Sequence, residues 1–263
     1  MGHGSHLMPH ACAGDTMWNP DQYERFRGER QQPFDDLLAL VERRDRMHVV
    51  DLGCGTGELT RKLHEHLHAE ETVGIDNSET MLLKSSAFGG EMMRFERGDI
   101  EAFIADRPFD LVFSNAALQW VGDHENLFRR LASFLAPHGQ LAVQMPANDD
   151  HPSHAVAAEV AASFGVSPRP TNVLAVDRYA TLLHHLGFQR QHVTLRVYAH
   201  TLHSSRDVVE WVKGTLLTDY ERRMSAADYE RFLEQYESAL LAAIGEEHPY
   251  FYTFKRTLMW GSF

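Results

Sequence analysis

Three aspartates follow or end successive apolar stretches of the chain, and a glycine-rich turn separates the first from the second. Asp51 lies in the apolar run 47–52, which stops at glycines in positions 53, 55 and 57. Asp76 ends the next apolar run, and Asp99 follows the third. In α/β proteins, a buried strand that leads through a glycine turn into a helix builds a nucleotide-sized cradle. Carboxylates around that cradle suit a ligand that is cationic or carries hydroxyl groups.

The spacing of the glycines disfavours a dinucleotide. Gly53 and Gly55 fit the pattern G-x-G-x-x-G, but Glu58 occupies the position of the last glycine. A dinucleotide site uses glycine there for close helix–strand packing, and its pyrophosphate lies on the helix N-terminus, where a carboxylate would repel it. Asp76 lies 19 residues beyond Gly57, near the distance at which an acid accepts hydrogen bonds from ribose hydroxyls.

The periodicity of the chain predicts the elements that hold these residues. Strands are expected near 47–52, 72–76, 92–95, 109–115, 139–145, 189–198 and 250–260. Helices are expected at 58–67, after Ser78, after Asp123, and at 155–164, 179–186, 205–213 and 225–244. This order predicts an α/β fold with a doubly wound, mostly parallel seven-stranded sheet, and a helical insert over 203–248 that caps the substrate side.

The chain is predicted to consist of a short N-terminal segment and one domain. Residues 1–16 are rich in Gly, His and Ser and are expected to be tag-like or disordered. Residues 17–263 are expected to form a single domain. Within it, 17–45 is predicted to form a helical flap over the first strand, with Pro20 and Pro33 at the starts of its two helices.

Composition narrows the class of partner. The 263 residues are 43% hydrophobic and 24% charged, with a formal net charge of -12, so nucleic acid and anionic membranes are disfavoured as partners. A small anionic substrate remains open if arginines line its pocket. The two cysteines indicate no disulfide framework, and no run reaches the roughly 18 apolar residues of a membrane helix. A cytoplasmic location is therefore expected. The protein is expected to be a monomer or a homodimer.

The segment Asp-Leu-Gly-Cys-Gly-Thr-Gly, residues 51–57, resembles motif I of class I S-adenosylmethionine (SAM)-dependent methyltransferases. The resemblance implies SAM as cofactor, S-adenosylhomocysteine as product, and a methionine portion that lies over the turn. It assigns Asp99 and Ile100 to the adenine, and Asn115 and Ala116 to the methionine portion. The full set of expected cofactor residues is Asp51, Gly53, Cys54, Gly55, Gly57, Asp76, Asn77, Met81, Asp99, Ile100, Asn115 and Ala116.

Longer segments resemble the bacterial trans-aconitate 2-methyltransferase family, which esterifies a carboxylate. They are Trp18-Asn19-Pro20 with Tyr23, Leu118-Gln119-Trp120, Val143-Gln144-Met145-Pro146 and Val209-Glu210-Trp211-Val212. The family's Gly-Leu-Arg-Pro is replaced here by Leu216-Leu217-Thr218-Asp219, which removes an arginine that could hold a carboxylate. The expected substrate residues are Trp18, Tyr23, Arg27, Arg30, Gln119, Trp120 and Gln144, with Gln119 and Trp120 nearest the methyl group.

Carboxyl methylation needs no catalytic base, because a carboxylate is already ionised at pH 7. The sequence offers no Ser/His/Asp or Cys/His constellation, and His64 and His68 lack a third metal ligand, so no catalytic group and no metal are predicted. Three alternatives stay open. One is a methyltransferase for a phenol, an amine or a larger acid, with His124 or His151 as the base. The others are a nicotinamide-dependent oxidoreductase, against which Glu58 argues, and a SAM-binding protein without turnover.

Overall fold

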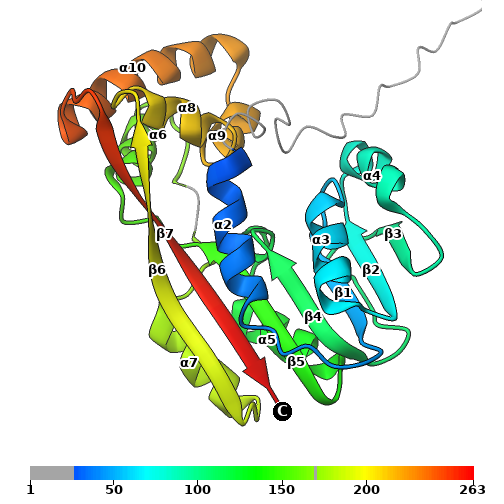
Figure 1. Cartoon of the computed structure of the whole chain (residues 1–263). Coiled ribbons are helices and arrows are strands. Elements are labelled where there is room, and N and C mark those ends of the chain that lie inside the picture. Colours follow the sequence, from blue (N-terminus) through cyan, green and yellow to red (C-terminus); the bar gives the residue numbers. More distant parts are fainter. Residues whose placement is uncertain (1–26, 169–170) are drawn as a thin grey trace, which may run out of the picture.

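A seven-stranded sheet runs through the molecule in the order β3-β2-β1-β4-β5-β7-β6 (Figure 1). The computed structural model describes residues 27–168 and 171–263, with side chains from residue 31 onward. β1 to β5 pair in parallel, and β7 is antiparallel to both β5 and β6, which confirms the predicted fold class. The strands are β1 (His48–Leu52), β2 (Glu71–Asp76), β3 (Met93–Arg97), β4 (Phe109–Asn115), β5 (Leu135–Pro146), β6 (Arg190–Leu202) and β7 (Tyr250–Ser262).

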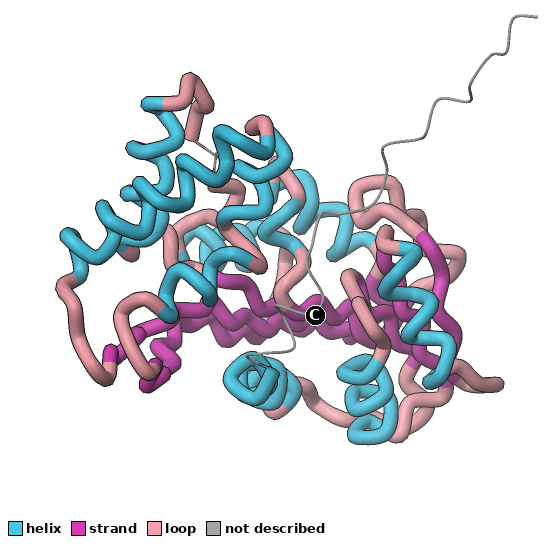
Figure 2. The backbone as a smooth tube through the Cα atoms, turned by 90° about the horizontal axis from the view of Figure 1, so that it is seen from above, coloured by secondary structure: helices cyan, strands magenta, loops and turns pink. Residues whose placement is uncertain are grey.

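Helices cover both faces of the sheet, as the view from above shows (Figure 2). Side chains alternate between the two faces along each strand, so Val50 and Val112 pack with α5 and α7, whereas Val49 and Phe113 pack with α2 and α3. The helices are α2 (Arg27–Leu38), α3 (Glu58–Leu67), α4 (Glu79–Ser85), α5 (His124–Ser133), α6 (Pro152–Ser163), α7 (Val176–His185), α8 (Asp207–Lys213), α9 (Leu217–Arg223) and α10 (Ala226–Ile244).

A third hydrophobic core lies above the sheet, between α6 and the segment that joins β6 to β7. α8, α9 and α10 make up this segment, and Trp211, Tyr220, Phe232 and Tyr236 are buried in its core. Tyr252 on β7 belongs to the same cluster, so the helices are anchored to the end of the sheet. The helical insert expected before the last strand is therefore present, with α9 as an element that the sequence pattern did not indicate.

Side-chain caps fix the starts of three predicted helices. Ser78 accepts from the backbone N–H of Met81 at 3.4 Å, and Asp123 accepts from that of Asn126 at 3.2 Å. Ser225 Oγ accepts from the backbone N–H of Asp228 at 3.1 Å, as its capping pattern predicts. Each cap satisfies a backbone donor that the helix itself leaves without a partner.

Two local predictions are wrong. Pro33 lies inside α2 instead of at its start, because Phe34, Leu37 and Leu38 are buried against the sheet and hold the helix despite the proline. The described part of the expected flap thus packs on the sheet, and its Gln31 and Phe34 also line the cavity described below. The fifth strand begins at Leu135 instead of Gly139, since β5 pairs with Phe109 before a register shift.

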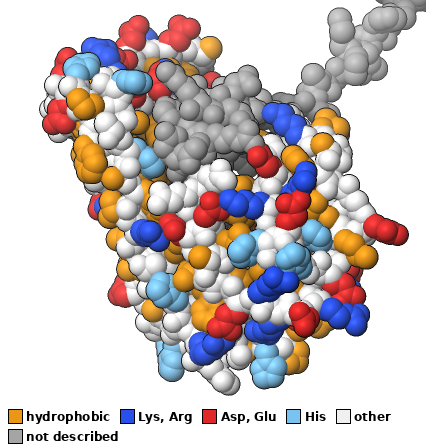
Figure 3. Space-filling model, in the orientation of Figure 1, with side chains coloured by type: hydrophobic (Ala, Val, Ile, Leu, Met, Phe, Trp, Pro, Cys, Tyr) orange, Lys and Arg blue, Asp and Glu red, His pale blue; other side chains and the backbone are white. Residues whose placement is uncertain are grey.

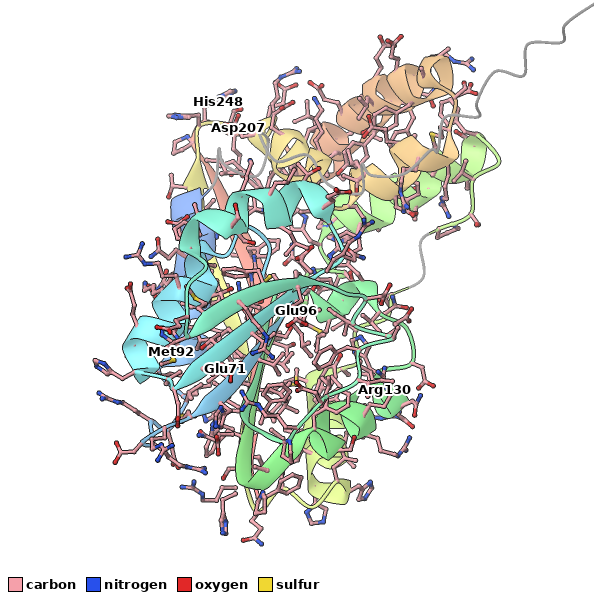
Figure 4. The ribbon with its side chains drawn as sticks, turned by 90° about the vertical axis from the view of Figure 1, so that its right-hand side faces the viewer. Glu71, Met92, Glu96, Arg130, Asp207 and His248 are labelled. Atoms are coloured by element: carbon pink, nitrogen blue, oxygen red, sulfur yellow. The ribbon has the colours of Figure 1, made fainter. Side chains whose placement is uncertain are left out.

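The β3 edge of the sheet carries charged side chains (Figure 4). Glu71 forms ion pairs with Arg94 and Arg107, and Arg94 also pairs with Glu96. Charges along an edge strand discourage pairing with another chain. On the face shown in Figure 3, acidic and basic side chains are interspersed instead of forming a basic surface. Within the described residues, no helix combines the length and the apolar character needed to span a bilayer.

Candidate active site

A cavity of ≈ 1100 Å³ opens at the carboxyl ends of the parallel strands. Its walls come from the loops after β1, β2, β3, β4 and β5, and from α2, the start of α3, α6, α8, α9 and β7. Ligands of open α/β sheets bind at this edge. The volume is sufficient for a nucleoside-sized ligand and a small second molecule together.

The glycine turn after β1 forms the floor of one end. The backbone N–H groups of Gly53 and Cys54 both donate to the Ile75 carbonyl, at 2.8 and 3.0 Å, which ties the turn to β2. Gly53 has φ +84°, and a Cβ there would lie 2.1 Å from Ala117 Cβ, so only glycine fits. Gly55 has φ +56° and faces open space, where a Cβ would intrude on a ligand.

Asp51 and Asp76 stand on either side of this turn. Asp76 accepts from the backbone N–H groups of Gly55 and Ser78, both at 2.9 Å, one on each carboxylate oxygen. Each oxygen keeps a free lone pair, as a pair of ribose hydroxyls would require. Burial raises the pKa of Asp76, against the effect of its backbone hydrogen bonds.

Asp51 is 4% exposed and accepts from Thr60 Oγ1 at 2.6 Å. Burial raises its pKa to about 7, and the nearby Asp76 adds to the shift, whereas the Thr60 hydrogen bond opposes it. A buried carboxylate with no cation beside it is costly, so the site is prepared for a positively charged ligand. Cys54 is a free, buried cysteine whose thiol pKa burial raises, which leaves it unreactive.

Other expected cofactor residues lie around the same end. Asn77 and Met81 line it after β2, and Asp99 and Ile100 line it after β3. A Cβ at Gly53 would also lie 3.9 Å from Ile100 Cδ1, so Ile100 and the glycine turn are adjacent.

Gly57 does not line the cavity. A Cβ there would meet Phe95 Cζ at 2.7 Å and Ser85 Cβ at 2.8 Å. This glycine therefore lets the start of α3 pack closely on its neighbours, and the expectation that it contacts the cofactor is wrong.

The segment after β4 lies between the two ends of the cavity. Asn115, Ala116, Gln119 and Trp120 all line it. Gln119 donates through Nε2 to the Ala116 carbonyl at 2.7 Å, and its Oε1 is buried without a hydrogen-bond partner in the described part of the chain. A buried acceptor without a donor is expensive, and a ligand donor at this point would remove the cost.

Gln144 is fully buried on β5 and does not line the cavity. Its Nε2 donates to Asn115 Oδ1 at 2.7 Å, and its Oε1 accepts from Arg256 Nη1 at 2.9 Å. The prediction that Gln144 contacts substrate is therefore wrong. It links a residue at the cofactor end to an arginine at the other end.

Sequence reasoning missed the residues of this second end. Arg256, on β7, is 6% exposed, lines the cavity, and stacks on the Phe254 ring with 4.8 Å from its guanidinium carbon to the ring centre. His154 and Asn148 also line it, and Asn148 Nδ2 donates to Tyr252 Oη at 3.2 Å. These residues follow the fifth strand, beyond every recognised motif, and only the position of β7 beside β5 brings Arg256 to the site.

The two histidines considered as bases lie away from the cavity. His124 is 2% exposed, with Nδ1 2.5 Å from Tyr179 Oη and Nε2 3.0 Å from the Leu118 carbonyl. Its pKa is lowered mainly by burial, so it is a neutral core residue that supports the segment before Gln119. His151 caps α6 by accepting from the Ser153 N–H, and burial lowers its pKa to about 4.

Two further expectations concern metal and the N-terminal residues. Among the described residues, no group of three or more His, Cys, Asp or Glu side chains could hold a metal ion. Trp18 and Tyr23 lie outside the described residues. Arg27 and Arg30 lie in the first turn of α2, and their side chains are outside the described part.

Comparison with known proteins agrees with this site. Residues 43–184 match a family model described as a methyltransferase domain. The chain is 41% identical to the trans-aconitate 2-methyltransferase of Deinococcus radiodurans, over 92% of this chain and 96% of that protein. It is 35% identical to the trans-aconitate 2-methyltransferase of Escherichia coli, over 85% of this chain and 88% of that protein.

Solved structures share the fold at low sequence identity. The YcgJ protein from Bacillus subtilis superposes with a TM-score of 0.61 at 15% identity, covering 88% of this chain and 98% of that chain. A phosphoethanolamine N-methyltransferase from Haemonchus contortus, in complex with S-adenosylhomocysteine, gives a TM-score of 0.58 at 16% identity. That match covers 92% of this chain and 56% of the other.

SAM fits the cofactor end by the geometry and charge of the site itself. The Gly55 turn faces open space, the Asp76 oxygens can accept two hydroxyls, and Asp51 offers a carboxylate to a cation. The unpartnered Gln119 Oε1 adds an acceptor where this end meets the other. The chain is a SAM-dependent methyltransferase and belongs to the trans-aconitate 2-methyltransferase family.

Proposed function

We propose that this enzyme forms a methyl ester on a small polycarboxylic acid of the trans-aconitate type. The observation that carries the proposal is Arg256, a buried guanidinium at the end of the cavity away from the cofactor. Arginine binds carboxylates through paired hydrogen bonds, and Gln144 and Phe254 hold this one in a fixed orientation. Relatives named for trans-aconitate over most of the chain support the same acceptor.

The chemistry requires positioning, with no proton transfer. SAM supplies an electrophilic methyl group on a sulfonium. The acceptor carboxylate is ionised at neutral pH, so Arg256 has only to bind and orient it within reach of the methyl group. Trp120 and Gln119 line the junction of the two ends and would exclude water there.

The other predictions follow from this assignment. The insert over 203–248 would act as the substrate-side cap, since Trp211, Thr215 and Tyr220 line the cavity. The physiological partner would be a small anionic acid in the cytoplasm. The free thiol of Cys54 fits this location, because the cytosol keeps thiols reduced. The oligomeric state, a monomer or a homodimer, stays a prediction.

One observation favours a second candidate, a methyltransferase for a phenol or amine. His154 lines the acceptor end, and its Nε2 lies 3.7 Å from Asp149 Oδ1. A histidine beside a carboxylate can accept a proton, as such acceptors require.

Production of S-adenosylhomocysteine, measured with SAM and a panel of acids, phenols and amines, separates the two. Turnover confined to acids, trans-aconitate among them, is expected. Turnover with phenols or amines and none with acids would contradict the proposed function.

A further inference from the structure

The two ends of the cavity differ in charge. The cofactor end carries the acids Asp51, Asp76, Asp99 and others. At the acceptor end, the described charged or titratable side chains in the lining are Asp149, His154, Tyr220 and Arg256, whereas Arg97 lines the cofactor end beside Asp99. The described lining at the acceptor end thus offers one guanidinium to a carboxylate, together with a histidine that already faces Asp149.

One side of the acceptor end is largely hydrocarbon, in contrast to the polar lining residues Asn148, Thr171, Asn172 and Thr215. Trp211 and Val212 from α8, Leu216 and Tyr220 at α9, and Phe254 from β7 line it. These side chains are between 1% and 8% exposed, and Trp211 packs against Phe254 with ring centres 5.5 Å apart. The wall is therefore closely packed against the core of the helical insert. Ala155 and Ala158 of α6 add small side chains that leave room beside it.

Leu216, the first residue of the segment that departs from the family pattern, belongs to this wall. Leu216 stands where the resemblance expects glycine, and it brings an isobutyl group to the cavity. Thr218 stands at the position of the expected arginine, is 6% exposed, and donates to the Thr215 carbonyl at 2.6 Å. Within the described lining, this segment therefore contributes the hydrocarbon side chain of Leu216 and no cation.

Such a wall discriminates between the arms of an acid. A carboxylate placed against the hydrocarbon side chains of Val212, Leu216 and Phe254 would lose water without gaining a partner, which is unfavourable. For an acceptor with an alkyl arm, kcat/KM would instead rise about fourfold for each methylene that is buried. We propose that the preferred acceptor is a dicarboxylic acid whose remaining arm is apolar, with a carboxylate on Arg256 and the arm against Leu216, Tyr220 and Phe254. This inference rests on the proposed function.

A matched series of acceptors tests the inference. Trans-aconitate is fumarate with a carboxymethyl arm, so 2-methyl-, 2-ethyl- and 2-propylfumarate change that arm alone. We expect kcat/KM to rise from the methyl to the propyl compound by about fifteenfold for two methylenes, and 2-propylfumarate to exceed trans-aconitate. A flat series, or trans-aconitate as the better acceptor, would overturn the inference and leave carboxyl methylation intact. No transfer to any acid by enzyme that binds SAM would overturn the proposed function itself.

A variant pair locates the effect on the wall. Leu216→Ala should reduce the preference for 2-propylfumarate over 2-methylfumarate several-fold while the Kd for SAM stays within twofold. Leu195→Ala, at a 46% exposed position on β6, is the matched control and should leave the preference unchanged. An unchanged preference in folded Leu216→Ala would show that the arm does not contact Leu216. If that variant fails to fold, the acceptor series of the unaltered enzyme still decides the inference.

Discussion

Arg256 connects the two ends of the cavity through hydrogen bonds whose direction its own charge sets. A guanidinium only donates, so Gln144 must present Oε1 to Arg256 and Nε2 to Asn115. Asn115 accepts through Oδ1, and its Nδ2 is left to donate toward the cavity. One buried amide thus orients groups that face the cofactor and the acceptor at once.

Replacing Arg256 tests this arrangement at the scale of one side chain. Arg256→Lys keeps the charge but loses the planar fork that a carboxylate matches. We expect KM for the acid to rise by about tenfold to a hundredfold, because a charge-assisted pair contributes roughly 1.5–3 kcal/mol, while the Kd for SAM changes little. Calorimetry for SAM and initial-rate kinetics for the acid give the two numbers. An unaltered KM would remove Arg256 from the acceptor site.

Sequence spacing brings most of the expected cofactor residues to one end of the cavity, whereas it does not indicate Arg256, His154 and Asn148 at the other end. Asp51, Gly53 and Asp76 belong to one strand–turn–helix–strand unit, in which local spacing determines position. Arg256 reaches the cavity only because β7 inserts beside β5, a pairing between residues more than a hundred positions apart. The sequence places Gln144 on the correct strand but predicts a substrate contact that its buried position does not allow.

At the scale of elements, the turn between β1 and α3 has the tightest steric requirement. Gly53 combines φ +84° with the close approach of Ala117, whereas Gly165 has φ +73° and open space where a Cβ would stand. Both glycines have a positive φ, at which an alanine would be strained. Of the two, only Gly53 lies where an added Cβ would clash with the segment after β4.

Gly53→Ala should therefore be more damaging than Gly165→Ala. Both variants strain the backbone, but only the first forces Ala117 to move, which adds about 1–3 kcal/mol of overpacking. Chemical denaturation gives the free energy of unfolding of each. SAM affinity is expected to fall in Gly53→Ala alone, and equal effects of the two variants on stability and affinity would contradict this view of the turn.

Strong periodicity identified most elements, and tertiary packing decided the rest. α3 and β4 match the predicted bounds, because an amphipathic or fully apolar run leaves few alternatives. Pro33 predicted the start of a helix that in fact begins earlier, since buried Phe34 and Leu37 outweigh the proline. α9 is only 7 residues long, and it is stabilised by burial of Leu217 and Tyr220 within the insert.

At the scale of the whole molecule, the ionised carboxylate of Asp51 lowers the stability of the ligand-free protein and favours the binding of a cation. The pKa of Asp51 is raised to about 7 from a usual value of 3.8, so between these pH values the folded state holds a proton that the unfolded chain has released. The stability of the ligand-free protein due to this group therefore falls as pH rises from about 4 to 7. A bound cation favours the ionised carboxylate, so SAM affinity should increase over the upper part of this range.

Asp51→Asn separates these two effects. Removing the buried charge should stabilise the ligand-free protein at pH 8, by up to about 4 kcal/mol, since each pKa unit corresponds to about 1.4 kcal/mol. The same change should weaken SAM binding at pH 8 and flatten its pH dependence. Thermal unfolding with and without SAM at pH 6 and pH 8 measures both. A variant that is less stable at pH 8 and binds SAM normally would contradict this role for Asp51.

The decisive measurement for carboxyl methylation is the identity of the methylated product. Enzyme supplied with SAM carrying a ¹³C-labelled methyl group and trans-aconitate or a 2-alkylfumarate should give one labelled methyl ester by NMR, which mild alkali converts to labelled methanol. Label in an alkali-stable ether or amine, or no label in any acid while SAM is bound, would contradict a carboxyl methyltransferase.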